Sequence, residues 1–120
     1  MEDPSKAWDG DLVRKWLERR LEAARLYQAA ADKRGYGAEE DYDKAAAEEW
    51  VCRALKTAGR FNHQAGFDAQ IKELLGRDEY RISGIHDDRR FDRYVRANLR
   101  KLAKMTKAND GFANTLRYQG

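Results

Sequence analysis

The sequence predicts an all-α protein, a small helical bundle of about four helices with a short C-terminal tail. Apolar residues recur at helical spacing in four segments, good helix formers dominate the composition, and the 120 residues contain one proline, Pro4. The length is typical of one domain. We therefore expect residues 1–120 to form a single helical domain, with 1–10 and 112–120 loosely ordered.

The first helix is expected from about Asp11 to Lys33. Asp9 or Asp11 can cap its start, and Gly35 can end it. Its apolar arc contains Val13, Trp16, Leu17, Ala24, Tyr27 and Ala31. Arg20 projects from the middle of this arc. Its charged head either extends past its neighbours into water or anchors a carboxylate or phosphate, in this chain or in a partner.

The second helix is expected from about Asp43 to Ala58, with Gly59 as its stop. The acidic stretch Glu39–Asp43 leads into it and suits the positive end of a helix dipole. Cys52 falls on the polar face, which predicts a solvated thiol. A single cysteine excludes an internal disulfide and favours a reducing compartment, so we expect a cytoplasmic protein. No apolar run approaches the roughly 20 residues of a membrane helix, so no membrane contact is expected.

A short third helix is expected from about Phe67 to Leu75, bracketed by Gly66 and Gly76. The following segment, Arg77 to His86, is expected to be a loop with apolar anchors, because a single strand there would have no evident partner. The fourth helix carries the clearest pattern and is expected from Asp87, which can act as its N-cap, to about Ala108.

Apolar and cationic side chains separate onto opposite sides of the fourth helix. The apolar side holds Phe91, Tyr94, Val95, Leu99, Leu102 and Met105, with the polar Asn98 among them. The cationic side holds Arg89, Arg90, Arg93, Arg96, Arg100, Lys101, Lys104 and Lys107. Asp92 is the one acid between 89 and 107. Like charges three or four residues apart each cost a few tenths of a kcal/mol, so folding alone does not require this arrangement.

A nucleic acid, RNA or DNA, is the partner predicted for this cationic side, bound mainly at its phosphates. Phosphate neutralisation releases counterions, and the arginine fork contacts phosphate with two hydrogen bonds. The predicted binding residues are Arg89, Arg93, Arg96, Arg100, Lys104, Lys107 and Arg20. Phe61, Tyr80 or Tyr118 could stack on bases. The chain is thus predicted to be a non-enzymatic nucleic-acid-binding protein, as a subunit of a larger nucleoprotein complex or alone.

The sequence is also compatible with three other roles. The cationic side could dock on an acidic protein surface, which would make the chain an interaction or inhibitor protein. It could also be a solvated face whose charge is offset by Glu39–Asp43 or by Glu48 and Glu49. Finally, leftover apolar surface could drive self-association into an oligomer. The residues that would do so are Trp8, Leu12, Leu26 and Phe112.

The sequence carries no motif typical of an enzyme or a metal site. It has two histidines, one cysteine, no Cys-x-x-Cys and no glycine-rich phosphate loop. The triplet His86-Asp87-Asp88 contains metal-binding residue types, but Asp87 is better used as a helix cap. We therefore expect no catalytic residues, no metal and no cofactor.

Two short stretches, Ala58 to Arg60 and Phe91 to Val95, loosely resemble the small helical subunits of CRISPR effector complexes. They cover a minority of the chain. The resemblance implies a helical protein that lines a nucleic-acid groove and stacks against neighbouring subunits. Small helical proteins encoded by phages, including inhibitors of host defence systems, share the same general pattern.

Overall fold

The structure is a computed structural model that describes residues 8–107, and within them it has four helices and no strand. The helices are α1 (Gly10–Arg34), α2 (Glu39–Ala58), α3 (Gln64–Leu75) and α4 (Asp88–Lys107). The predicted all-α bundle is confirmed. The predicted tail, from residue 112 onward, lies outside the described residues.

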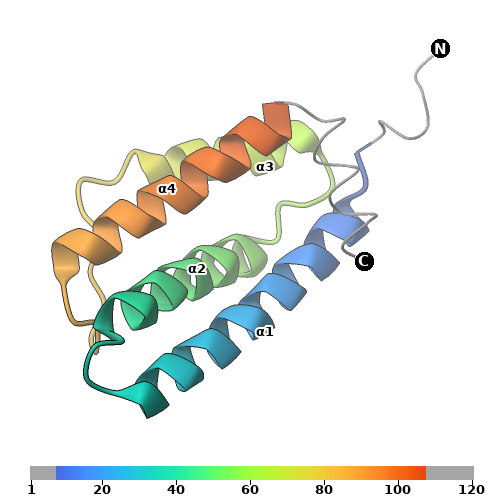
Figure 1. Ribbon diagram of the computed structural model, residues 1–120. Helices are drawn as coiled ribbons and strands as arrows, with labels where there is room; N and C mark the ends of the chain where they lie inside the picture. Colours follow the sequence, from blue (N-terminus) through green and yellow to red (C-terminus); the bar gives the residue numbers. More distant parts are fainter. Residues whose placement is uncertain (1–7, 108–120) are drawn as a thin grey trace.

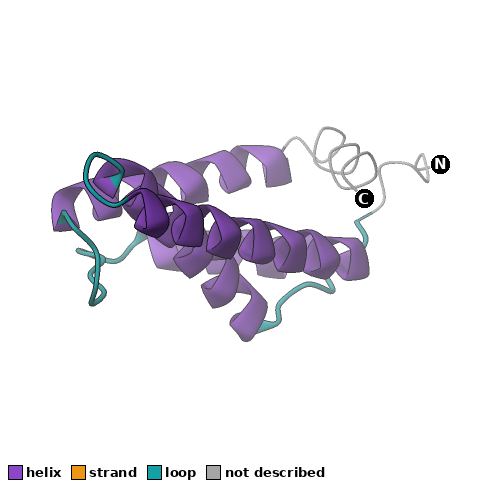
Figure 2. Cartoon of the chain, turned by 60° about the horizontal axis from the view of Figure 1, so that its bottom comes forward, coloured by secondary structure: helices purple, strands orange, loops and turns teal. Residues whose placement is uncertain are grey.

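The four helices form two antiparallel hairpins, α1–α2 and α3–α4. Helix α2 lies between α1 and α4, while α3 packs on α4 and, over a smaller area, on α2 (Figure 1). Helices α2 and α4 run in the same direction, opposite to α1 and α3. Figure 2 shows the loops that join them at the two ends of the bundle. None of the helices in residues 8–107 is long and apolar enough to cross a membrane.

One apolar core joins all four helices. Its fully buried members include Leu17, Val51, Leu55, Phe67, Ile71, Phe91, Val95 and Leu99. Burial of each large side chain contributes roughly 1.5–3 kcal/mol. The apolar spacing that predicted the helices therefore also places them against one another.

The prediction that Cys52 is solvated is wrong. Its side chain is 3% exposed and belongs to the core. The prediction assumed one apolar stripe on α2, but α2 is covered by α1 on one side and by α4 on another. Burial raises the pKa of the Cys52 thiol to about 12.

The first helix is capped as predicted, but α2 and α3 begin earlier than expected. The Asp9 carboxylate caps α1 by accepting from the Asp11 and Leu12 amides at 3.0 and 3.2 Å. Helix α2 begins at Glu39 rather than Asp43, so the acidic stretch forms its first turn instead of preceding it. Helix α3 begins at Gln64 rather than Phe67, which places Gly66 inside it.

The start of α1 lies very close to the loop before α3. The Trp8 indole donates a hydrogen bond of 2.7 Å to the Phe61 carbonyl, and its ring packs on Phe67. A methyl group added at Gly10 would lie 2.3 Å from that same carbonyl oxygen. Glycine is therefore required at this point for the two backbones to approach.

Candidate nucleic-acid interface

Helix α4 turns one side into the core and the opposite side to solvent. Phe91, Val95, Leu99 and Leu102 are between 0% and 4% exposed. The exposed residues on the opposite side are Arg89, Arg93, Ala97, Arg100, Lys101 and Lys104. The predicted separation of apolar and cationic sides is confirmed for these residues. The helix extends to Lys107, whose side chain lies outside the described part of the chain.

Arg90 does not belong to the solvent-facing side, because it is paired with a buried carboxylate of α2. Asp43 is 0% exposed, and its Oδ2 accepts from Nε and Nη2 of Arg90 at 3.1 and 2.8 Å. The same carboxylate accepts from the His86 and Asp87 amides at 2.8 and 3.0 Å. The hydrogen bond to Asp43 raises the pKa of Arg90. Four hydrogen bonds thus attach the start of α4 to α2.

The Asp87 carboxylate completes this attachment as the N-cap of α4. Its Oδ1 accepts from the Arg90 amide at 3.1 Å, as the sequence predicted. That hydrogen bond lowers the pKa of Asp87. The cap and the Asp43 contacts together fix where α4 begins and which side it turns to solvent.

Arg96, one of the predicted binding residues, is used within the chain. Its Nε donates to Asp92 at 3.0 Å. Its two terminal nitrogens donate to the carbonyls of Leu75, Arg77 and Asp78, at 3.3, 2.8 and 3.0 Å. Those carbonyls lie at and beyond the end of α3, where a helix leaves acceptors without helical partners. Arg96 therefore binds the free carbonyls at the C-terminal end of α3 and is not part of the candidate interface.

Five exposed cations of α4 have no carboxylate partner within residues 8–107. Four of them, all but Lys101, share one strip of the helix, and we call these four the outer row: Arg89, Arg93, Arg100 and Lys104. At 100° per residue they lie within about 60° of one another, and at 1.5 Å per residue they extend over about 22 Å. The outer row is thus a narrow, straight line of positive charge on the exposed side of one helix.

Tyr94 joins the outer row to α2 through its ring and hydroxyl. The Arg93 guanidinium and the Lys44 amine lie 5.5 and 6.0 Å from the ring centroid. The hydroxyl donates to Glu40 at 2.6 Å, and this hydrogen bond raises the pKa of Tyr94. Lys44 was not among the predicted site residues, because contacts between helices are not visible in the pattern of a single helix.

The remaining predicted site residues lie apart from the outer row. Arg20 of α1 forms an ion pair with Glu48 of α2, which matches the predicted anchoring of a carboxylate in this chain. Phe61 and Tyr80 are 9% and 2% exposed, so the prediction that they stack on bases is wrong. Both side chains fill the core beneath loops. Tyr118 lies outside the described residues.

Asn98, the polar residue on the apolar side of α4, bonds within its own helix. Its amide donates to the Tyr94 carbonyl one turn earlier, at 2.8 Å. The side chain is half-buried. One of the two amide hydrogens is thus bound within the helix itself.

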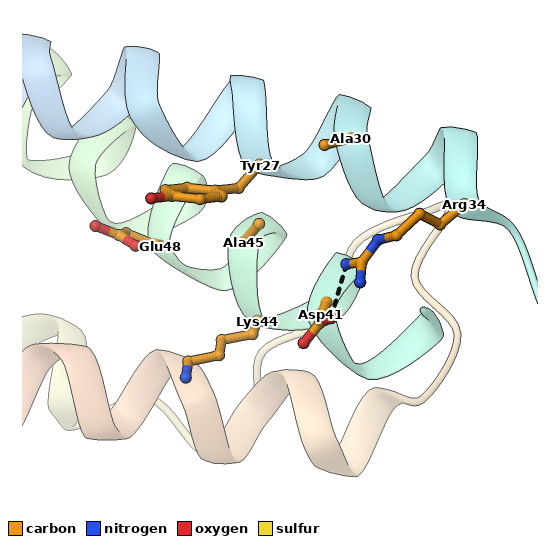
Figure 3. A pocket seen from close by; sticks show the side chains of 7 residues that line it. All are labelled: Tyr27, Ala30, Arg34, Asp41, Lys44, Ala45 and Glu48. Atoms are coloured by element: carbon orange, nitrogen blue, oxygen red, sulfur yellow. Dashed lines mark hydrogen bonds and ion pairs between the residues drawn. The ribbon is translucent and has the colours of Figure 1, made fainter. Parts of the chain in front are cut away.

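A groove of about 460 Å³ lies between α1 and α2, separate from the outer row. Figure 3 shows its lining, with Tyr27, Ala30 and Arg34 from α1 and Asp41, Lys44, Ala45 and Glu48 from α2. Arg34 donates to Asp41 at 2.7 Å, and Glu48 is paired with Arg20. Because charges of both signs are already paired along its walls, the groove has no dominant charge.

The described residues contain no cluster of three or more His, Cys, Asp or Glu side chains that could hold a metal ion. His86 instead contacts the Tyr42 ring edge-on, with centroids 5.1 Å apart. Its backbone amide is bound by Asp43. The triplet at 86–88 is therefore part of the attachment of α4.

Comparison with protein-family models, with curated proteins and with solved structures gave no match to this chain. The function is therefore inferred from the chemistry and geometry of the outer row.

Proposed function

We propose that this chain is a non-enzymatic nucleic-acid-binding protein whose outer row contacts phosphate groups. The observation that carries the proposal is that four cations share one exposed strip of α4 with no carboxylate partner in the described part of the chain. A line of fixed positive charge attracts a polyanion, and release of its counterions supplies affinity.

The arrangement has an energetic cost that favours a binding role. Arg89 and Arg93 are four residues apart, as are Arg100 and Lys104, and each such like-charge pair destabilises a helix by about 0.2–0.5 kcal/mol. The start of α1, by contrast, places opposite charges one turn apart, as in the ion pairs of Arg14 with Asp11 and Glu18. A phosphate backbone bound to the outer row would relieve its repulsion.

The test is a fluorescence anisotropy titration of labelled nucleic acid across a range of salt concentrations. Four phosphate contacts predict a log–log salt slope of about −3.5 on duplex DNA. The double variant Arg93→Gln/Arg100→Gln is expected to bind roughly tenfold more weakly, with a slope of about −2.

The matched control removes two positive charges away from α4, in Lys33→Gln/Arg60→Gln. Lys33 is exposed at the end of α1, and Arg60 is exposed in the loop before α3. This control is expected to leave affinity and slope nearly unchanged. Absence of binding at low salt, or equal losses in both double variants, would refute the proposal. Binding of an acidic polypeptide such as polyglutamate with no binding of nucleic acid would assign the outer row to an acidic protein partner instead.

A further inference from the structure

We infer that the ligand of the outer row is duplex DNA, with α4 lying along the mouth of the major groove, rather than single-stranded nucleic acid or duplex RNA. This inference rests on the proposed function and narrows its ligand class. Three features of the structure support it: the absence of an exposed aromatic ring on α4 beside the row, the straightness of the row, and a small exposed residue next to its midpoint.

Single-stranded nucleic acids are bound mainly by stacking of bases on exposed aromatic side chains. The aromatic residues of α4 cannot serve this purpose. Phe91 is 0% exposed, and the half-buried Tyr94 has Arg93 and Lys44 against its ring and Glu40 at its hydroxyl. In the loop before α4, Tyr80 is 2% exposed, with Arg96 5.0 Å above its ring.

The tyrosines that are exposed lie on other elements. Tyr27 is 69% exposed on α1, and Tyr36 is 100% exposed in the turn between α1 and α2. Neither belongs to α4 or to the loop that leads into it. Within residues 8–107, bases of a single strand that followed the outer row would therefore find no exposed aromatic ring on α4.

A straight line of charges suits a stiff ligand whose phosphates are already ordered. The outer row lies on an unbroken helix, and both flanks of α4 are fixed, by Arg90 to Asp43 and by Arg96 to the end of α3. A duplex pays little ordering entropy on such a surface, whereas a flexible strand must first be straightened. Duplex DNA also releases more counterion per neutralised phosphate than a single strand does.

The shape of the exposed side distinguishes the two kinds of duplex. Ala97 is exposed midway along α4, with Arg93 and Lys104 to one side of it and Lys101 to the other. A small side chain there allows the helix axis to approach a groove while the long cations reach the phosphates. The B-DNA major groove is about 12 Å wide and admits a helix, whereas the A-form RNA major groove is too narrow.

The experiment compares one sequence as duplex DNA, single-stranded DNA and duplex RNA, each of about 20 nucleotides or base pairs, in the same anisotropy assay. We expect duplex DNA to bind about tenfold more tightly than either alternative at equal salt. Equal or tighter binding of the single strand or of duplex RNA would overturn the inference but leave the proposed function standing. Failure of all three to bind would instead refute the proposed function.

The variant Ala97→Trp tests the approach of the helix without any change of charge. It is expected to weaken duplex DNA binding about tenfold, because the ring holds the helix away from the groove, and to strengthen single-strand binding by supplying a stacking surface. Ala29→Trp, at an exposed position of α1, is the control and should change neither the duplex affinity nor the single-strand affinity. Unchanged duplex affinity in folded Ala97→Trp, checked by its helical circular dichroism, would contradict insertion of α4.

Discussion

The arginines at the flanks of α4 and the cations of its outer row have opposite relations to the rest of the chain. Arg90 and Arg96 are each 21% exposed and make multiple hydrogen bonds to Asp43, to Asp92 and to loop carbonyls. Arg93 and Arg100 are exposed, with no carboxylate partner within residues 8–107. The same residue type thus stabilises the bundle at one angle of the helix and is exposed to solvent at another.

The largest expected effect comes from removal of the buried carboxylate at one flank. Asp43→Ala leaves the Arg90 charge without its partner and two backbone amides without an acceptor, so we expect a loss of about 3–5 kcal/mol. The measurement is the free energy of unfolding from urea denaturation. Asp41→Ala is the matched control on the same helix, because Asp41 and Arg34 are both 60% exposed. It should cost less than about 1 kcal/mol. Equal losses of unfolding free energy in the two variants would show that the buried Asp43–Arg90 pair stabilises the bundle no more than the exposed Asp41–Arg34 pair does.

The second-largest effect is expected at the other flank of α4, at Arg96, with Arg100 of the outer row as the comparison. Arg96→Ala removes the donors that close the end of α3, and we expect a loss of about 2 kcal/mol in the free energy of unfolding. Arg100→Ala, one turn later, should stay within about 0.5 kcal/mol of the native chain. If Arg100→Ala proved as destabilising as Arg96→Ala, the outer row would have a structural role beyond the contacts described above.

A smaller change in the free energy of unfolding, of opposite sign, is expected when one charge of the outer row is reversed. Arg100→Glu places a carboxylate four residues from Lys104 and from Arg96, so the variant should gain about 0.5 kcal/mol of stability at low salt. The gain should shrink at about 1 M salt, where charges are screened. The same variant should lose nucleic-acid affinity. A stabilised protein that binds less well would indicate that the row is retained for binding.

The smallest effect concerns reactivity rather than stability, at the α1–α2 interface. Because burial raises the pKa of Cys52 to about 12, almost no thiolate exists in the folded chain at pH 8. A thiol reagent such as Ellman's reagent should react slowly with the folded protein and rapidly in urea, where the pKa returns to about 8.5. In Asp43→Ala the folded-state reaction should accelerate if detachment of α4 also loosens α2. Rapid labelling of the native chain would contradict the burial of Cys52.

The sequence predicted the fold well where each helix carries its own pattern. The stop at Gly35, the cap at Asp87 and the inward side of α4 depend on residues close together in sequence, and all were found where expected. The starts of α2 and α3 were placed four and three residues too late. Acidic and glycine residues were interpreted there as lead-in segments although they fit the first helical turns.

The candidate site was predicted less completely, because it depends on contacts between helices. The pattern of α4 shows eight cations on one side, but it does not show that Arg90 reaches a buried carboxylate on α2 or that Arg96 reaches the end of α3. The same limit accounts for the wrong prediction that Cys52 is solvated and for the omission of Lys44 from the predicted site, since α2 contacts three other helices. A single helix shows which residues share a side, and only the packed bundle shows which of them remain free.

The carboxylate of Asp43 has a mechanical consequence for the bundle. It binds the loop before α4 and the first turn of α4 at once, from a side chain that belongs to the α1–α2 hairpin. Rotation of one hairpin against the other would have to break all of these hydrogen bonds together. We therefore expect that force applied to α4 would be transmitted to the α1–α2 hairpin instead of being absorbed by the connecting loop.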